Sequence, residues 1–423
     1  MAEVSFLYGS GSIKTEIADE RLLAVLEPKA AAPSDQTEAE LIADAMRAPR
    51  GAKPLCELAK GKRKIVLIAS DHTRPVPSRL IVPPMLHEIR AGNPDADVTI
   101  LIATGCHRGT TEAELRAKFG DEIVSREKIV VHDCEDEDNL VEIGTLPSGA
   151  ALRINRIAAE ADLLVAEGFV EPHFFAGFSG GSKSVLPGIC ARRTVMANHC
   201  SKFIDSPFAR TGILDGNPIH RDMLAAARMA KLAFVCNVVL DADKKVIFAA
   251  AGDPDDAQRA GADFLLGRSM VKPAVADVVI STNGGYPLDQ NIYQAVKGMT
   301  AAEATVREGG VIIMCAKSGD GHGGERFWKT FRDEKDVSRL LSTFRATAPE
   351  DTIPDQWQSQ IFARVLSRAT VIYLSEAPDE LVRDLHMIPV HSLEEAIAEA
   401  DRILGYKGTI TAIPDGVGVI VRA

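Results

Sequence analysis

Three short segments of the chain place histidine, arginine, carboxylate and lysine side chains directly after apolar runs. They read DHTRP at residues 71–75, GCHRGTT at residues 105–111 and EPHFFAGFSGGSKSVLPG at residues 171–188. Imidazoles move protons near neutral pH, arginine binds carboxylates or phosphates, and a desolvated lysine amine can attach a ligand covalently. These residue types make the three segments candidates for a functional site, and Arg74 suits a ligand that carries a carboxylate or a phosphate.

In the first segment, a proline restrains the backbone just beyond an expected strand. Arg74 offers a planar guanidinium that suits a carboxylate or a phosphate. The alternative is that Asp71 and Arg74 form a pair that caps a helix expected from about Ser78. The segment by itself leaves both interpretations open.

In the second segment, His107 lies between an expected strand and an expected helix. Thr111 followed by Glu114 has the spacing of a capping box, which predicts that a helix begins there. Single histidines are usually structural, but this position is at the mouth of a sheet rather than on an apolar face. The location therefore favours a functional role for His107.

The third segment combines glycines with hydroxyl side chains. Its glycines leave backbone N–H groups accessible to a phosphate, and its serines add hydroxyl donors. The pattern predicts a nucleotide-like ligand. The residues concerned are Gly177, Gly180, Gly181, Ser179, Ser182 and Ser184.

The stretch GFSGGSKS is close to the Walker A spacing of nucleoside-triphosphate loops. Ser182 occupies the position of the second glycine, however, and Pro187 follows too soon for the helix that normally begins there. The sequence thus disfavours an ordinary P-loop and leaves Lys183 as a candidate for covalent attachment.

Two later positions carry further candidates. His199 stands next to Cys200, a pair of metal-ligand types that has little specificity alone. Gln294 and Lys297 are three residues apart and should share one helix face. A solvated helix surface is the competing interpretation for that pair.

The apolar runs that precede the three segments predict a mostly parallel sheet. Lys64–Ser70, Val98–Thr104 and Asp162–Val170 are nearly continuous, as in strands buried on both faces. Ala233–Leu240 predicts a further strand. Ligands bind at the carboxyl ends of strands in open α/β sheets, so the three segments should converge on one crevice.

A break near residue 270, marked by glycine and proline, divides the pattern. We predict two α/β domains with mostly parallel, Rossmann-like sheets, residues 1–270 and 271–423, with the active site in the interdomain cleft. The smaller second domain should contain strands at Asp277–Thr282, Val311–Lys317 and Ala369–Ser375. The last apolar run, residues 417–423, could return to the first domain.

Composition limits the classes of partner. The net charge of −11 over 423 residues argues against nucleic acid or an anionic membrane surface. No apolar run reaches the roughly 18 residues of a membrane helix, and the start lacks the pattern of a signal peptide. We expect a cytoplasmic protein whose seven cysteines, without a CxxC pair, are free thiols.

Six motifs in order give the chain a family resemblance. DHTRP, GCHRGTT, EPHFFAGFSGGSKSVLPG, NHC, QNIYQAVKG and PDQWQ resemble the nickel-pincer-dependent lactate racemase family of 2-hydroxyacid racemases and epimerases. The resemblance extends from about residue 64 to residue 360. It implies a nickel-pincer nucleotide, Ni(II)-pyridinium-3,5-bisthiocarboxylate mononucleotide, made and inserted by separate cofactor-biosynthesis enzymes.

The resemblance also implies roles for individual residues. Lys183 would attach the cofactor covalently, His199 would be the nickel ligand, and His107 and His173 would be the acid–base pair. Arg74, Gln294 and Lys297 would contact the substrate. The remaining cofactor contacts would come from Asp71, His72, Thr73, Arg74, Gly177, Ser179, Gly180, Gly181 and Trp357.

The implied reaction interconverts the two configurations of a 2-hydroxyacid. One histidine removes the hydroxyl proton while the Cα hydride moves to the cofactor, and the 2-oxoacid reorients before the hydride returns to its other face. A zinc hydrolase that uses His107, His173 and His199 is one alternative, although it leaves Lys183 without a purpose. A noncatalytic cofactor-binding protein is another, although it needs no pair of bases. The sequence specifies neither the 2-hydroxyacid nor the oligomeric state.

Overall fold

The computed structural model describes residues 1–29, 35–241 and 243–422. The described residues form two compact units. The first unit takes its residues from Ala31–His199 and Ser206–Leu265, and the second from Met1–Ala30, Cys200–Asp205 and Leu266–Ala423. This arrangement differs from a single division near residue 270, because the N-terminal strands belong with the C-terminal part of the chain.

The main sheet of the first unit has the strand order β13-β12-β9-β4-β5-β6. All neighbouring strands are parallel except β12 and β13, which are antiparallel. The strands predicted from the apolar runs are present to within one residue at each end, and every residue of β9 is buried. The strands are β4 (Lys64–Ser70), β5 (Asp97–Ala103), β6 (Lys128–Val131), β9 (Leu163–Phe169), β12 (Leu232–Leu240) and β13 (Val246–Gly252).

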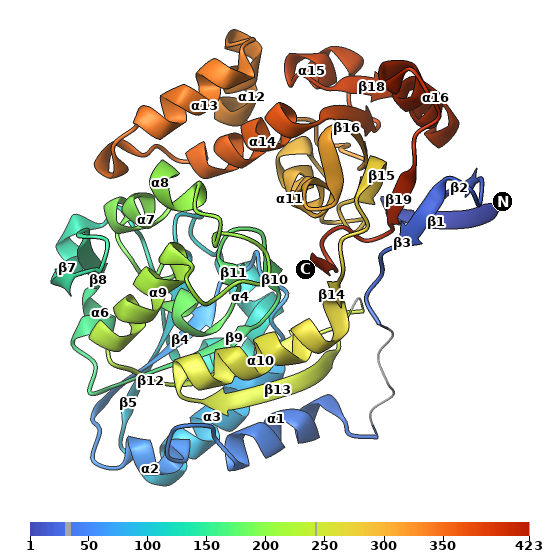
Figure 1. Cartoon of the computed structure of the whole chain (residues 1–423). Coiled ribbons are helices and arrows are strands. Elements are labelled where there is room, and N and C mark those ends of the chain that lie inside the picture. The colour runs from blue at the N-terminus through green and yellow to red at the C-terminus, as the bar shows by residue number, and fades with distance from the viewer. Residues whose placement is uncertain (30–34, 242, 423) are drawn as a thin grey trace. The chain divides into compact units, whose positions relative to one another are not determined.

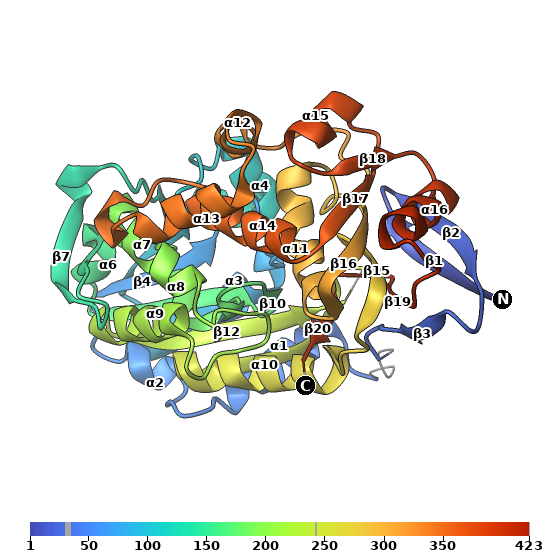
Figure 2. The same cartoon turned by 45° about the horizontal axis from the view of Figure 1, so that its top comes forward.

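Helices cover both faces of this sheet. In both views α1, α2 and α3 lie on one side of the sheet and α9 lies on the other (Figures 1 and 2). This coverage explains why the strands are apolar throughout rather than alternating. The longer helices are α1 (Glu38–Arg47), α3 (Ser78–Gly92), α4 (Glu112–Phe119), α9 (Pro218–Met229) and α10 (Pro254–Ser269). The shorter ones are α2 (Leu55–Ala59), α5 (Asp121–Arg126), α6 (Arg156–Ala159), α7 (Arg192–Asn198) and the 3-10 turns η1 (Glu137–Asn139) and η2 (Gly181–Ser184).

Two small hairpins complete the first unit. Strands β7 (Leu140–Thr145) and β8 (Ala151–Asn155) form one, and β10 (Pro172–His173) and β11 (Gly177–Phe178) form the other. The second hairpin directly follows β9, so it carries His173 at the carboxyl edge of the main sheet.

The main sheet of the second unit is parallel throughout, in the order β18-β17-β16-β15-β19-β3. Strand β3 is an edge strand on β19, held by backbone bonds such as Leu26 N–H to the Ala412 oxygen at 2.8 Å. This pairing places the chain start in the second unit. The strands are β3 (Leu22–Val25), β15 (Ala276–Thr282), β16 (Val306–Cys315), β17 (Thr370–Leu374), β18 (Ile388–Val390) and β19 (Ile410–Ile413).

Figure 2 shows how this sheet is covered. Helices α11 and α14 lie on one side, and α16 lies on the other side with the β1–β2 hairpin. The late apolar run contributes β20, which pairs with β14 within the second unit, while Ala423 lies outside the described residues. These elements are β1 (Ala2–Tyr8), β2 (Gly11–Ile17), β14 (Met270–Val271), β20 (Ile420–Val421), α8 (Ser201–Ile204), α11 (Ile292–Glu303), α12 (Glu325–Asp333), α13 (Val337–Ala346), η3 (Pro349–Asp351), α14 (Gln356–Arg368), α15 (Asp379–Asp384) and α16 (Leu393–Leu404).

Candidate active site

The three polar segments meet at one edge of the first unit's sheet. They follow β4, β5 and β9, which are neighbours in the sheet. His107 Nδ1 lies 2.7 Å from Asp71 Oδ2, and the Gly105 N–H donates to the Gly188 oxygen at 2.9 Å. The first contact joins the β4 loop to the β5 loop, and the second joins the β5 loop to the glycine-rich segment. The predicted convergence is therefore confirmed.

Asp71 is a buried carboxylate that fixes the orientation of His107. Its side chain is 1% exposed, and Oδ1 accepts hydrogen bonds from the Thr73 N–H at 3.1 Å and from the Thr73 hydroxyl at 2.7 Å. Burial by itself raises the pKa of Asp71, but the bonds from His107 and Thr73 outweigh it and hold the pKa below its usual value. Because an ionised carboxylate only accepts, His107 carries its proton on Nδ1 and presents a lone pair at Nε2.

This geometry decides between the two interpretations of the first segment. Helix α3 begins at Ser78 as expected, yet its cap residue Pro77 makes no side-chain hydrogen bond. Asp71 is bonded to His107 instead, and Arg74, an exposed residue, donates from Nη1 to the Thr73 hydroxyl at 3.2 Å. The Asp–Arg helix cap is therefore wrong.

The loop that carries His107 is held at its far end by the predicted capping box. Thr111 caps α4 through the Glu114 N–H, and the Glu114 carboxylate accepts in return from the Thr111 N–H at 2.8 Å. Glu114 also pairs with Arg108, and His72 lies 3.1 Å from the Thr110 hydroxyl. His72 thus contacts the loop after His107, and Arg108 of this loop is paired with Glu114 on α4.

Glu167 and Lys118, which are not among the predicted site residues, hold the first segment and the strand end before it by hydrogen bonds. Glu167 on β9 is 3% exposed and accepts from the Ser70 N–H and hydroxyl, both at 2.9 Å. Lys118 on α4 donates to the Arg74 oxygen at 3.1 Å. Burial lowers the pKa of Lys118, while Glu167 and Asp71 act in the opposite direction. A carboxylate inside the apolar run DLLVAEGFV was a visible signal for Glu167, whereas nothing in the sequence marked Lys118.

The aromatic ring of Phe175 joins three of the predicted site residues. His173 contacts it edge-on with centroids 4.5 Å apart, and His199 does so at 5.1 Å. The Lys183 Nζ lies 5.9 Å from the ring centroid. Asn217, which caps α9, donates to the Phe175 oxygen at 2.9 Å and fixes the hairpin. No motif in the sequence marks Phe175 or Asn217 as part of the site.

His173 is held differently from His107. Its Nδ1 accepts a hydrogen bond from the Ala176 N–H at 3.3 Å, and its ring stacks on Phe174 with centroids 5.2 Å apart. Since Nδ1 is the acceptor, the neutral ring carries its proton on Nε2. The two imidazoles therefore rest in opposite tautomers.

His199 is a buried, neutral imidazole at the end of α7. It is 5% exposed, and burial, reinforced by the charge of Lys183, lowers its pKa to about 3. A neutral imidazole is the form that binds a transition metal. Among the described parts of the chain, no three His, Cys, Asp or Glu side chains gather as a ready metal site. His199 accordingly offers a single protein ligand.

The glycines of the third segment are required by packing within the protein. Three of its four glycines, Gly177, Gly180 and Gly181, have positive φ, and a Cβ at Gly180 would lie 2.8 Å from the Phe169 oxygen. A Cβ at Gly181 would lie 2.7 Å from Gln258 Oε1, and one at Gly177 would overlap the backbone of residue 213. The Gln258 amide also donates to the Gly180 oxygen at 3.1 Å. Close packing of this loop is therefore a reason for the glycines that does not depend on a bound phosphate.

The Ser179 hydroxyl is engaged inside the same loop. It donates to the Phe169 oxygen at 2.9 Å and accepts from the Glu171 N–H at 2.9 Å. These two bonds close the loop on the end of β9. Ser179 therefore has a structural task in addition to the cofactor contact predicted for it.

The remaining predicted residues belong to the second unit. Gln294 and Lys297 are half-buried residues of α11, three positions apart as expected. Trp357 lies on α14, which packs against α11, and hydrogen-bonds to the Tyr293 hydroxyl. Tyr293 in turn donates to Asp355 at 2.8 Å. Trp357, Tyr293 and Asp355 are thus linked by hydrogen bonds within the second unit.

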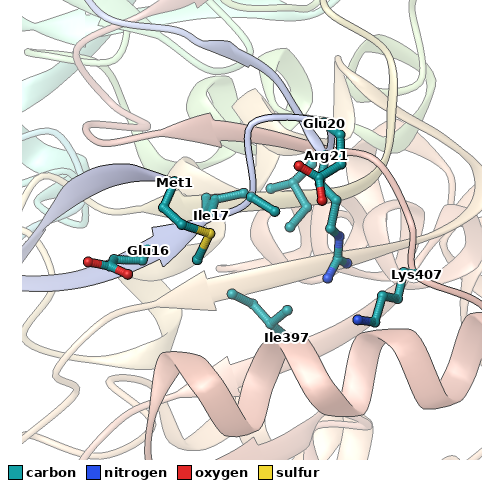
Figure 3. A pocket seen from close by; sticks show the side chains of 9 residues that line it. Met1, Glu16, Ile17, Glu20, Arg21, Ile397 and Lys407 are labelled. Carbon is teal, nitrogen blue, oxygen red and sulfur yellow. The ribbon is translucent and has the colours of Figure 1, made fainter.

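A surface pocket of about 380 Å³ in the second unit has no part in this site. It lies between the β1–β2 hairpin and α16, with Arg21 and Lys407 among its lining residues (Figure 3). The Arg21 guanidinium is already paired with Asp401 at 2.6 Å and donates to the Gly408 oxygen at 2.9 Å. None of the predicted site residues lines this pocket.

Within the described ranges, no helix is both long and apolar enough to cross a bilayer.

The fold and the predicted site residues together indicate the class of protein. The chain is a protein of mostly parallel α/β sheets, and His107, His173, Lys183 and His199, which the sequence predicted as site residues, all lie in the first unit. The sequence matches the family described as lactate racemase N-terminal domain over residues 8–212 and lactate racemase C-terminal domain over residues 271–421. The chain belongs to the lactate racemase family, and it is an isomerase of the racemase type.

Individual relatives agree along the whole chain. The lactate racemase of Thermoanaerobacterium thermosaccharolyticum is 50% identical and that of Lactiplantibacillus plantarum 51% identical, each over 424 residues that cover 100% of both chains. The structure of the T. thermosaccharolyticum lactate racemase apoprotein matches with a TM-score of 0.97 over 100% of both chains. A Thermotoga maritima crystal structure at 18% identity matches with a TM-score of 0.64 over 93% of this chain, which shows the shared fold alone.

Proposed function

We propose that the protein racemises or epimerises a 2-hydroxyacid of the lactate type, with His107 and His173 as the proton-transferring residues. The observation that carries the proposal is the Asp71–His107 hydrogen bond of 2.7 Å at the carboxyl edge of the sheet. It leaves His107 Nε2 as a base of fixed direction, which is the group that removal of a hydroxyl proton requires. Membership in a racemase family supports this proposal over a zinc hydrolase or a noncatalytic carrier.

The residues around Phe175 fit the cofactor that the family resemblance implies. His199 supplies one neutral, buried nitrogen for nickel, and Lys183 supplies an amine 5.9 Å from the Phe175 ring centroid for covalent attachment. When bound, a nickel-pincer nucleotide would reversibly accept the Cα hydride and so leave a 2-oxoacid. The cofactor has to be made and inserted by other enzymes, which are the expected partners.

The chain's own residues would move the proton and hold the substrate. As His107 accepts the hydroxyl proton at Nε2, the ionised Asp71 stabilises the imidazolium through Nδ1–H. Arg74, beside Thr73 and His107, would bind the substrate carboxylate. His173 would exchange a proton with the opposite enantiomer, for which the bond from the Ala176 N–H has to be released. The contacts of Gln294, Lys297 and Trp357 with substrate or cofactor remain predictions.

The first experiment tests the proton-transferring roles. The protein is produced together with the cofactor-biosynthesis enzymes and assayed for loss of optical activity with single enantiomers of lactate and other 2-hydroxyacids. H107A and H173A should each lower kcat by about 10²–10⁴-fold, the usual contribution of a general acid or base. The control is H87A, which changes an exposed histidine on α3. Turnover that persists undiminished in H107A and H173A would contradict the proposal.

A second experiment tests hydride transfer. Racemisation carried out in deuterium oxide should give product without deuterium at Cα, because a hydride that returns never exchanges with solvent. Intact-mass measurement should locate the cofactor on Lys183 and find none on K183A. Wash-in of deuterium at Cα, or an unmodified Lys183 in active protein, would overturn this mechanism.

A further inference from the structure

Cys106 and Cys134 lie just beyond the ends of the neighbouring strands β5 and β6, and Cys106 directly precedes His107. Strands β5 and β6 are parallel neighbours with Ile102 paired to Val131. Beyond the strand ends, the His132 N–H donates to the Ile102 oxygen at 3.0 Å, and the Thr104 hydroxyl donates to the His132 oxygen at 2.7 Å. Cys106 and Cys134 each follow two residues later, at matching positions of the two chain segments.

The two thiols contact each other. The Cys106 S–H donates a hydrogen bond to the Cys134 sulfur, which raises the pKa of Cys106 and lowers that of Cys134. The charge of the Arg192 guanidinium lowers the pKa of Cys134 further. The backbone N–H of Arg192 donates a hydrogen bond to the backbone oxygen of Cys134 at 3.1 Å. Both cysteines are free thiols, Cys134 buried and Cys106 half-buried. A thiol pair with one accessible member is thus in place beside the proposed base.

We propose that Cys106 and Cys134 form a modification site for low-molecular-weight disulfides, which oxidise the pair to an intramolecular disulfide. As Cys106 transfers its proton to the Cys134 sulfur to which it is hydrogen-bonded, the accessible Cys106 sulfur attacks one sulfur of the external disulfide. The first small thiolate is released and takes the proton from Cys134. The Cys134 thiolate then attacks the Cys106 sulfur of the mixed disulfide and releases the second. Two electrons pass to the external disulfide, and the two protons lost by the protein thiols convert the released thiolates into thiols.

The disulfide would affect the proposed reaction through His107. His107 follows Cys106 directly, and the Asp71–His107 bond of 2.7 Å depends on where this loop lies. A covalent sulfur–sulfur bond would draw Cys106 toward the end of β6 and displace the His107 imidazole from Asp71. Since a displacement of about 1 Å can cost up to about 100-fold in rate, oxidation should lower turnover at least about tenfold. This consequence rests on the proposed function, whereas the disulfide itself does not.

The test treats the cofactor-loaded protein with oxidised glutathione, alkylates the remaining thiols and maps the peptides by mass spectrometry. A peptide pair linked between Cys106 and Cys134 is expected, with the loss of two hydrogens and full reversal by dithiothreitol. C134S should stop at a glutathione adduct on Cys106, and C134A serves the same purpose without a buried hydroxyl. C56S is the matched control, because Cys56 is also half-buried but hydrogen-bonds to Glu88, and it should form the link unchanged.

The outcomes separate the disulfide from the function. Full alkylation of both cysteines, or a lasting glutathione adduct on wild-type Cys106, would overturn the modification site. A linked pair in protein that never racemises any 2-hydroxyacid would refute the proposed function and leave the site standing. A linked pair with unchanged turnover would refute the coupling to His107.

Discussion

The two imidazoles proposed for proton transfer are held in contrasting ways. His107 has a side chain that is 44% exposed and is oriented by a buried, ionised carboxylate 2.7 Å away. His173 lies on a short hairpin, where it contacts a backbone N–H and the rings of Phe174 and Phe175. The difference teaches that one imidazole is prepared as a base by electrostatics, while the other is placed by packing.

The largest effect is expected when the hydrogen bond between Asp71 and His107 is changed. D71N keeps the shape of the side chain but removes the acceptor that fixes the Nδ1–H tautomer of His107. We expect kcat to fall by about 10²–10⁴-fold, equivalent to ~3–5 kcal/mol of transition-state stabilisation, with the pH profile of the remaining activity shifted. Intact mass should show unchanged attachment at Lys183. Loss of the attachment instead would make Asp71 a cofactor-binding residue, as the family resemblance implies.

A smaller effect is expected on the packing side. F175L retains an apolar side chain but removes the ring that contacts His173 and His199. We expect the free energy of unfolding to fall by about 1–2 kcal/mol, and kcat to fall about tenfold. F234L, at a fully buried position on β12, should cost similar stability with little change in kcat. Equal losses of activity in the two variants would contradict a specific role for Phe175.

Two glycine substitutions sharpen the packing argument by separating backbone strain from crowding. Gly181 and Gly149 both have positive φ, but a Cβ at Gly181 meets Gln258 and one at Gly149 meets nothing within 4 Å. G149A should lower the free energy of unfolding by about 1 kcal/mol, because alanine is strained at positive φ. G181A should lower it by about 2–4 kcal/mol, because overpacking against Gln258 adds about 1–3 kcal/mol to the same strain. Chemical denaturation measures both. Equal destabilisation would mean that the loop needs glycine only for its backbone angles.

The smallest effect is a pH dependence of stability. The folded pKa of Asp71 is below its unfolded value of about 3.9, so its stabilising contribution is fully present above that value. It is lost as the pH falls through the folded pKa. The stability difference between wild type and D71N should therefore be larger at pH 6 than at pH 3. A constant difference over this range would show that Asp71 is not specifically stabilised as the ion.

The first unit's sheet was largely predictable from sequence because its strands are buried on both faces. Continuous apolar runs gave β4 with the same bounds as the structure, and the Thr111–Glu114 capping box marked the start of α4. The pairing of β3 with β19 was not predictable in the same way. It joins segments almost four hundred residues apart through backbone hydrogen bonds, which leave no pattern in the side chains.

By itself, the sequence determined the family, the α/β class and the edge at which Asp71, His107 and Lys183 follow their strands. Residue order fixes these features, because parallel strands bring their carboxyl ends to one edge. Only the tertiary structure decided that Asp71 is the partner of His107, that Phe175 joins His173 to His199, and that packing requires the glycines. Such contacts depend on side-chain directions and distances between different loops, which the order of residues leaves open.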